Sequence, residues 1–462
     1  MDYQAEKKER FAYGLWFLGE NIIWAYVALA STFLLDIGID ATLASAILLG
    51  PKIWDAVNDT LFGFIVDKKK FKNGEKFMPW IRIGNILIGL MIILMYAIPA
   101  SLKSDTIKIV WFVFAYLAMD FAYTLMDAPM FAMPTVMTSN IHERTDLISA
   151  NRFCGIFGGI IATVLIPIIR PKLGWFVTGV IFSILGTILM TPFLMWGKER
   201  IHVSAEKEKE YSFSEMLRYL RTNRYLLISL LLIFVQGASS IESVLSLITA
   251  RNCLGSESMA TVLTAVALGP TILMALLVPK LAKKYDKTSL IMFGLIASFV
   301  GSTAMYLVGY HNFVLIAFFL MVKGVGISFF LILSYMLVGD SVEYGTYKTG
   351  TRATGISFSL QTFTAKMKNA VIGSLSLFAL GLFGYDSDLG ETVRQSEEVI
   401  KGIWAVYNLM PAIGALFCIL MLVLFYKMRD KDVEVMAAYN SGAISKQEAE
   451  KALYDKYGAA GE

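Results

Sequence analysis

Charged residues and cysteines are scarce in this chain of 462 residues. Only 17% of its residues are charged and 56% are hydrophobic, whereas soluble domains carry roughly 25% charged residues. The three cysteines, Cys154, Cys253 and Cys418, show no paired spacing and no accompanying histidine cluster, so they indicate neither a disulfide framework nor a zinc site. The composition excludes an ordinary soluble domain and predicts an integral membrane protein.

Catalytic and nucleotide-binding motifs are also missing. The chain has no Gly-Lys-Ser/Thr phosphate loop and no serine nucleophile elbow, and its three histidines fall between apolar runs. The net charge of +4 comes from loops and does not form a basic nucleic-acid face. We therefore expect no enzyme activity, no organic cofactor, no nucleic-acid partner and no transport powered by ATP; no obligate protein partner is evident.

Long apolar runs recur along the whole chain. Most approach the ~20 residues that a bilayer core requires, and they predict an all-α membrane protein of about twelve helices. The predicted spans are 11–35, 43–66, 80–98, 107–137, 149–169, 175–196, 225–249, 259–281, 290–308, 313–337, 355–383 and 403–426. The predicted domains are an N-terminal six-helix half (1–197), a charged cytoplasmic linker (198–224), a C-terminal six-helix half (225–428) and a polar cytoplasmic tail (429–462).

The distribution of lysine and arginine predicts the orientation. Basic residues precede the first span and fill the loops 67–79 and 282–289, whereas the alternate loops are poor in them. Cytoplasmic loops carry such an excess, so both termini are expected in the cytoplasm and the protein in the cell membrane. The first span is too long for a cleaved signal peptide.

A short internal repeat supports two related halves. The segment Glu143–Ser149 is similar to Thr351–Ser357, half a chain further on. Two six-helix halves related by an axis along the membrane normal form the major facilitator fold, in which the substrate binds between the halves near the midplane.

Three polar residues interrupt the predicted second span. Asp55, Asn58 and Asp59 are spaced i, i+3 and i+4, so they share one helical face. An ionisable group at the centre of a membrane helix costs roughly 2.5–3.5 kcal/mol on insertion scales, which calls for a compensating partner. A hard cation, Na⁺ or H⁺, is such a partner.

Several motifs in order along the chain resemble the glycoside-pentoside-hexuronide:cation symporters. They are Tyr13-Gly14 with Gly19-Glu20-Asn21, the segments 52–59 (KIWDAVND) and 74–80 (GEKFMPW), Tyr123-Thr124 with Asp127-Ala-Pro129, Asn151-Arg152-Phe153, and the segment 340–347 (DSVEYGTY). The resemblance implies a major facilitator fold and cation-coupled sugar transport.

The resemblance also implies a cation site. It would consist of Asp55, Asn58, Asp59 and Thr124, and this all-oxygen set favours Na⁺ over H⁺. The alternative is that these groups only pair with nearby lysines, such as Lys366, in a buried network. Lys366 matches a family lysine close to the cation carboxylates, which makes it a candidate coupling residue.

For the sugar, the resemblance points to Asn21, Asp127 and Arg152, with Tyr123 and Phe131 as aromatic neighbours. A carboxylate accepts from two hydroxyls and a guanidinium donates to them. Asn21 and Phe131 replace an aspartate and a tryptophan of the melibiose carrier, so the particular sugar stays open.

A charged motif at the cytoplasmic end is a candidate gate. It comprises Asp340, Glu343, Tyr344 and Arg352, and a helix-capping network is the alternative interpretation. Asp120, Glu242 and Lys323 have no family match; we expect a mutual or local ion pair for Glu242 and Lys323, and an acidic substrate as the alternative use of Lys323.

Together these features predict a secondary transporter that carries a glycoside, pentoside or hexuronide with a cation by alternating access. The competing interpretations are a proton-coupled carrier, an uncoupled facilitator, and a membrane glycoside sensor that moves nothing.

Overall fold

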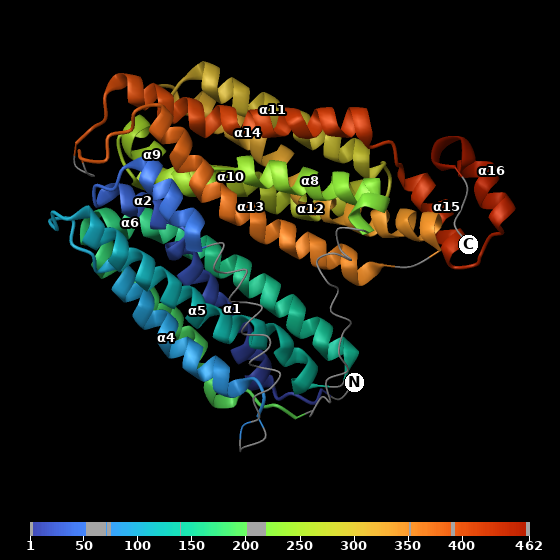
Figure 1. Cartoon of the computed structure of the whole chain (residues 1–462), viewed down its shortest axis with the longest axis horizontal. Coiled ribbons are helices and arrows are strands. Elements are labelled where there is room, and N and C mark those ends of the chain that lie inside the picture. The colour runs from blue at the N-terminus through green and yellow to red at the C-terminus, as the bar shows by residue number, and fades with distance from the viewer. Residues whose placement is uncertain are drawn as a thin grey trace. The chain divides into compact units, whose positions relative to one another are not determined.

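The computed structural model of the protein describes residues 3–51, 71, 75–138, 140–200, 219–350, 353–389 and 393–458. The elements in these ranges are α-helices (Figure 1). In the first part of the chain they are α1 (Lys7–Val27), α2 (Ala30–Asp36), α4 (Met78–Tyr96), α5 (Asp105–Met137) and α6 (Ile141–Trp196). In the second part they are α8 (Arg224–Ser239), α9 (Glu242–Leu254), α10 (Ser258–Ala282), α11 (Lys287–Val308), α12 (Phe313–Thr349), α13 (Thr354–Leu382), α14 (Glu397–Phe425), α15 (Asp430–Asn440) and α16 (Lys446–Tyr457).

The predicted membrane spans correspond to these helices. Within the described ranges, eight helical stretches are long and apolar enough to cross a membrane, and Ala41–Pro51 forms a shorter apolar helix. That short helix covers the beginning of the predicted second span. The remainder of this span, and the linker from 201 to 218, lie outside the described residues.

The structure keeps one predicted break between spans and adds two further breaks. The predicted spans 149–169 and 175–196 both fall within α6, and Gly174, whose φ of +73° and ψ of 176° are not helical, divides α6 into two helices between them. A left-handed φ costs glycine little because glycine has no Cβ. The predicted first span breaks into α1 and α2, and the predicted seventh breaks into α8 and α9 around Ser240.

The chain forms two compact units. Unit 1 contains residues 1–208 together with 244–261 and 376–399, and unit 2 contains 209–243, 262–375 and 400–462. Unit 1 therefore includes, from the second half of the sequence, most of α9 with the start of α10, and the end of α13 with the start of α14. The boundaries of the predicted halves stay a prediction.

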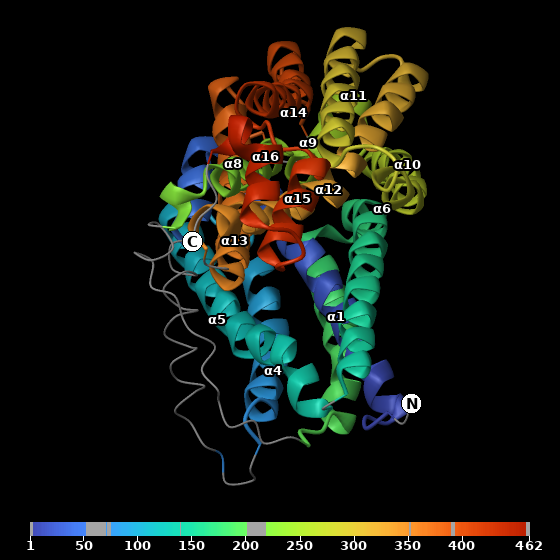
Figure 2. The same ribbon diagram turned by 90° about the vertical axis from the view of Figure 1, so that its right-hand side faces the viewer.

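Unit 1 is built around the pairing of α1 with α6, which lie side by side (Figure 2). The two helices approach closely because a glycine lies where they cross. A Cβ at Gly158 would come within 2.2 Å of the Leu18 backbone carbonyl oxygen, which is too close for any side chain. Helix α4 packs against α5 and α6. This packing brings polar side chains of α1 and α5 into the interior of the unit.

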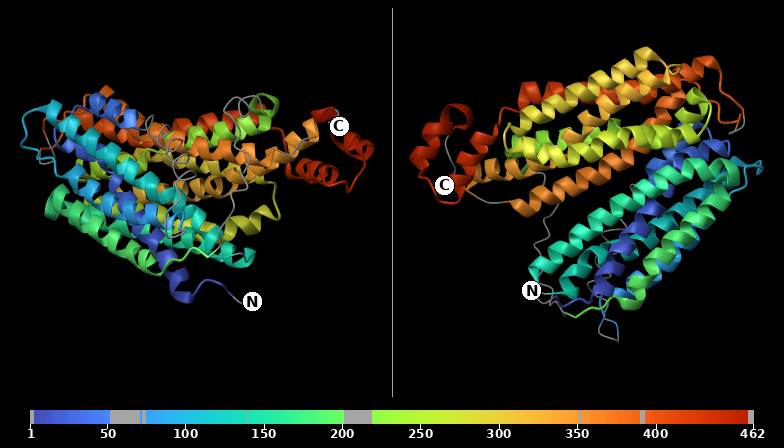
Figure 3. Two further views of the ribbon diagram at one scale, coloured as in Figure 1. Left: turned by 60° about the horizontal axis from the view of Figure 1, so that its bottom comes forward. Right: turned by 180° about the vertical axis from the view of Figure 1, so that it is seen from behind.

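Unit 2 contains the pair α11 and α12, with α8 packed on α12. At one end of α12, the helices α15 and α16 of the tail fold back on the unit (Figure 3). A buried cluster of Tyr225, Tyr344, Tyr347, Tyr426 and Tyr457 joins the tail to the membrane helices. The polar tail thus contains two helices, α15 and α16, within its described residues.

Candidate functional site

The interior of unit 1 holds two carboxyl groups on apolar helices. Glu20 of α1 is 3% exposed, and its carboxyl group lies within hydrogen-bonding reach of the Asp127 carboxyl on α5. The Tyr123 hydroxyl is within reach of both. Trp24 faces the Tyr123 ring edge-on, with 4.6 Å between ring centroids. Four polar or aromatic side chains from two helices thus form one cluster.

Asn21 and Phe131 flank this cluster. The Asn21 side-chain amide nitrogen donates to the Phe17 carbonyl oxygen at 2.8 Å, and the side-chain oxygen of Asn21 takes no part in this bond. A Cβ at Gly155 of α6 would come within 2.8 Å of the same amide nitrogen, so a larger residue there would displace the Asn21 side chain. Phe131 is half exposed, and its ring centroid lies 5.4 Å from that of Phe17. The structure therefore brings Tyr123, Asp127 and Phe131 of α5 against α1, whereas the side chain of Asn21 lies next to Gly155 of α6.

The third helix at this place is α6. Its Asn151 is buried and lies within hydrogen-bonding reach of the Tyr13 hydroxyl of α1. Arg152 follows Asn151 on the same helix. The side chain of Arg152 is outside the described part of the chain, so its role in sugar binding stays a prediction.

The predicted cation site is described only at Thr124. This residue is 3% exposed and donates its hydroxyl to the Asp120 carbonyl oxygen at 3.1 Å, one turn earlier on α5. Asp120 is equally buried. Asp55, Asn58 and Asp59 lie outside the described residues, so the assembly of the cation site is not tested. Lys366 lies on α13 in unit 2, and its proposed coupling role likewise stays a prediction.

The candidate gate residues make contacts inside unit 2. Asp340 accepts from the Lys287 ammonium group at 2.8 Å, and Glu343 accepts from the Asn440 amide on α15 at 2.8 Å. Tyr344 belongs to the tyrosine cluster under the tail. All three lie within α12, which extends beyond the predicted end at residue 337. Arg352 is outside the described residues.

The expected pairing of Glu242 and Lys323 is confirmed. Their carboxylate and ammonium groups form an ion pair, and Lys323 is 1% exposed. A buried lysine keeps its charge at acceptable cost only when such a partner is present.

A second buried polar cluster in unit 1 has no counterpart in the sequence analysis. We call it the four-charge network; it consists of Asp36 at the end of α2, Arg170 in α6, Arg251 in α9 and Glu257 after α9. Arg170 lies 2.9 Å from Asp36 and 3.0 Å from Glu257. Arg251 lies 2.6 Å from both acids. Two acids and two guanidinium groups compensate one another there.

An aromatic residue completes the four-charge network. The Trp175 indole N–H donates to Asp36 at 2.9 Å, and the Arg170 guanidinium carbon lies 4.5 Å from the centroid of the same indole ring. Burial raises the pKa of Glu257, although Arg170 and Arg251 oppose this shift. The network was missed because its members come from four separate segments with no regular spacing. The only sequence signal for the network was Asp36, an acid in a segment with few polar residues.

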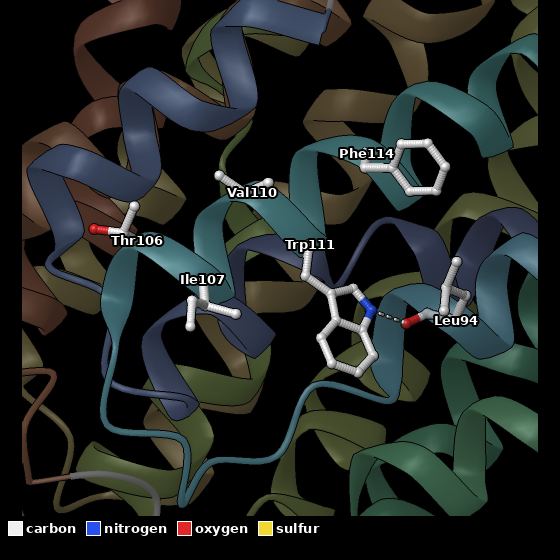
Figure 4. A pocket seen from close by; sticks show the side chains of 6 residues that line it. All are labelled: Leu94, Thr106, Ile107, Val110, Trp111 and Phe114. Carbon is white, nitrogen blue, oxygen red and sulfur yellow. Dashed lines mark hydrogen bonds between the residues drawn. The ribbon is translucent and has the colours of Figure 1, made fainter.

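An apolar surface pocket lies elsewhere on unit 1. It is lined by Leu94 of α4 and by Thr106, Ile107, Val110, Trp111 and Phe114 of α5 (Figure 4). The Trp111 indole N–H donates to the Leu94 carbonyl oxygen at 3.0 Å. Ile107, Val110 and Phe114 are more than half exposed, as expected for a surface that faces lipid. The pocket offers no charged group for a sugar.

Long apolar helices that bury carboxyl, amide and phenol groups indicate a class of protein, the multi-pass membrane protein. The family model for MFS/sugar transport proteins matches residues 11–430, and the chain belongs to this family. It is therefore a transporter and not an enzyme. The match confirms the predicted all-α major facilitator fold and the resemblance to sugar symporters.

Curated relatives align along nearly the whole chain. A symporter of Bacillus subtilis, YjmB, is 27% identical, over 92% of this chain and 93% of its own length. A glucuronide carrier protein homolog of Escherichia coli is 26% identical, over 93% and 94%. The isoprimeverose transporter of Lactiplantibacillus pentosus is 24% identical, over 93% and 90%.

Solved structures agree with the fold. The nucleoside transporter NupG superposes with a TM-score of 0.66 at 15% identity, over 89% of this chain and 99% of that one. A D-xylose-proton symporter superposes with a TM-score of 0.60 at 12% identity, over 89% and 96%. At these identities the similarity establishes the fold alone.

Proposed function

We propose that the protein is a cation-coupled symporter of the cell membrane that imports a glycoside, pentoside or hexuronide, with Na⁺ as the favoured ion. The observation that carries this proposal is the cluster of Glu20, Tyr123 and Asp127 inside apolar helices of a sugar-transport family member. Sugar hydroxyls both donate and accept, so a site of carboxyl, phenol and amide groups suits them. The relatives named for glucuronide and isoprimeverose transport support this class of cargo.

In this proposal the coupling ion binds at Asp55, Asn58, Asp59 and Thr124. The sugar binds at Asn21, Asp127 and Arg152, with Tyr123 and Phe131 against its ring. At about 100 mV, one entering positive charge supplies roughly 2.3 kcal/mol, which supports about fifty-fold accumulation of a neutral sugar. Coupling requires that each ligand raises the affinity for the other. Lys366 is the proposed link between the two sites.

The four-charge network is a second candidate gate, separate from the candidate gate of α12. It ties Asp36 and Arg170 to Arg251 and Glu257, which come from the second half of the sequence. Under the predicted orientation this is the extracellular side. We propose that the network closes that side and opens during alternating access. Both termini are proposed to lie in the cytoplasm.

The first test needs no knowledge of the sugar. The thermal stability of the purified full-length protein is measured against Na⁺, with choline keeping the ionic strength constant, beside the Asp59→Asn variant. A ligand bound only by the folded state stabilises it by about 2.7 kcal/mol at one hundred times its dissociation constant. We expect saturable stabilisation by Na⁺ that the variant lacks.

The control is Asp388→Asn, which removes an exposed acid and should leave the response to Na⁺ intact. Equal stabilisation of the parent and Asp59→Asn would refute the cation assignment. No response in either protein would favour proton coupling or facilitation.

Counterflow of labelled isoprimeverose or of a labelled glucuronide into proteoliposomes then separates a transporter from a sensor, because a sensor binds its ligand without exchanging it.

A further inference from the structure

Glu20 has no role in the coupling or gating described above, yet it is the more buried member of the Glu20–Asp127 pair. One of its carboxyl oxygens, Oε1, is buried and has no hydrogen-bond partner among the described residues. A carboxylate in this position would leave a charged oxygen without a donor in a region of low dielectric constant, which is strongly unfavourable. The environment therefore favours the neutral, protonated form of Glu20.

The contact between the two acids has a direct chemical meaning. An ionised carboxylate is only an acceptor, so two carboxylates cannot hydrogen-bond to each other. Glu20 and Asp127 lie within hydrogen-bonding reach, and that contact is favourable only when one of them carries a proton. Pairs of acids that share a site in other proteins hold one proton for this reason.

The elements packed around the pair supply few opposing charges. Helix α1 contributes Tyr13 and α5 contributes Tyr123, both neutral hydroxyl groups. Helix α4 has one charged residue, Arg82, whose guanidinium binds Glu75 at 2.8 Å. Helix α6 has Arg152 within its predicted membrane span; this side chain, like residues 52–70 with Asp55 and Asp59, is outside the described part. Lys323 is bound by Glu242 in unit 2.

We propose that Glu20 and Asp127 form a proton-binding site that holds one shared proton within the sugar site, with the proton on Glu20 and the negative charge on Asp127. The proton lets Glu20 donate to Asp127, and this hydrogen bond orients the Asp127 carboxylate that the proposed function places against the sugar. This step rests on the proposed function in one respect, the contact of Asp127 with the sugar. The proton site itself is separate from the Na⁺ site and does not depend on it.

The site links sugar affinity to pH. Loss of the shared proton to solvent places two negative charges side by side and removes the hydrogen bond that orients Asp127. Binding of the sugar by the singly protonated pair therefore falls about tenfold for each pH unit above the point at which the proton leaves. An acidic sugar depends on the proton more strongly than a neutral one, because it adds a further negative charge.

The proton is observed directly by infrared spectroscopy of the full-length protein in lipid nanodiscs, titrated with pH as the only ligand. A protonated carboxyl group has a carbonyl stretch that an ionised one lacks and that shifts in heavy water. We expect the wild type to keep such a band at neutral pH and to lose it in alkaline solution. Glu20→Gln should lose the band at neutral pH, because the single acid Asp127 ionises there. Glu242→Gln, which removes a lysine-paired acid, should keep it.

Absence of the band from the wild type at neutral pH, or the same band in Glu20→Gln, would overturn the proposal. If Glu20→Gln does not fold, Glu20→Asp is the deciding variant. It keeps a carboxyl group, so the band should remain at neutral pH and disappear at a pH different from that of the wild type. An unchanged titration would contradict the assignment.

The infrared readout does not depend on transport. A protein that exchanges sugar but lacks the band refutes the proton site alone, and a protein with the band but no counterflow refutes the proposed function alone.

Discussion

Asp127 is the residue on which the proposed sugar site depends most. It lies on α5, partly buried, and contacts both Glu20 and Tyr123. Its carboxylate can accept from two sugar hydroxyls, and hydrogen bonds to a charged group contribute about 1.5–3 kcal/mol each. Asp127 thus connects the shared proton to the sugar.

Asp127→Ala is expected to weaken sugar binding about ten- to hundred-fold, the equivalent of one or two such hydrogen bonds. Stabilisation by Na⁺ should persist, because the proposed Na⁺ ligands are other residues. Isothermal titration with the sugar identified by counterflow measures the first quantity, and thermal stability against Na⁺ measures the second. Asp105→Ala, an exposed acid in the first turn of the same helix, is the control. Unchanged sugar affinity in Asp127→Ala would remove Asp127 from the site.

At this scale the sequence predicted Asn21, Tyr123 and Asp127 through motif resemblance, and the structure brings Tyr123 and Asp127 against α1, the helix that carries Asn21. It did not predict the pairing of Glu20 with Asp127. An isolated acid in an apolar span has no spacing pattern, and its partner is on a helix far away in sequence. Resemblance also offered no help, since it directed attention to the neighbouring Asn21.

Helix ends in this protein are held by side chains from distant parts of the chain. Glu199, after α6, accepts from the backbone N–H groups of Lys76, Phe77 and Met78 at 2.7–2.8 Å and so caps α4. Asp286 caps α11 through the Ser289 N–H at 3.0 Å and also binds Arg429 at 2.9 Å, before α15. The first turns of a helix have unpaired N–H groups, which such carboxylates satisfy.

Asp286 makes the attachment of the tail dependent on pH. Burial raises the pKa of Asp286, but the N–H groups and Arg429 outweigh it, and the net pKa is lowered below its ordinary value near 3.8. A carboxyl group with a lowered pKa in the folded state adds stability above its unfolded pKa, and this stability is lost as the pH falls through the folded value.

We therefore expect Asp286→Asn to lower the stability of the protein by about 1–2 kcal/mol at neutral pH. The difference from the parent should shrink below pH ~4, where the parent carboxyl begins to protonate as well. Thermal melts of both proteins at several pH values measure this convergence. Asp455→Asn, an exposed acid on α16, should match the parent throughout. A constant difference between Asp286→Asn and the parent at every pH would argue against an ionised Asp286.

The lengths of the apolar runs predicted the membrane helices well and their interruptions poorly. The breaks after Val27 and around Ser240 depend on how backbone groups are satisfied by neighbouring helices. Hydropathy measures only side-chain transfer, so it contains no information on these bends. The long α12 was predicted too short because Asp340 and Glu343 end the apolar run without ending the helix.

For the whole molecule, the four-charge network is the strongest link between the two halves of the sequence within unit 1. Arg170 and Asp36 are each at most 3% exposed at their side chains, and Arg251 is 13% exposed. Breaking one partner of a buried ion pair costs about 3–5 kcal/mol, because the remaining charge is left uncompensated. If the transporter opens by separating these ion pairs, contacts formed in another state of its cycle must compensate the lost free energy.

In the Asp36→Asn variant, we expect this end of unit 1 to open more often than in the parent protein. Cys253, two residues after Arg251, is buried and serves as a native probe. With Cys154 and Cys418 replaced by serine, the rate of maleimide labelling at Cys253 should rise at least about tenfold, since a shift of 1.4 kcal/mol is enough for that factor. Asp388→Asn, between α13 and α14 in the same unit, should leave the rate unchanged. A labelling rate in Asp36→Asn equal to that of the parent would contradict a closing role for the network.

The four-charge network also bears on the order in which the protein is made. Asp36 and Arg170 are synthesised well before Arg251 and Glu257, and residues 376–399 of the same unit follow later still. While the ribosome is still translating the second half, the early helices hold an acid and an arginine that each lack their second partner. Unit 1 therefore cannot reach its final form from the first six spans alone. A chain cut at the linker would expose in the membrane the charged groups that lack their partners, and the protein quality-control machinery could recognise them.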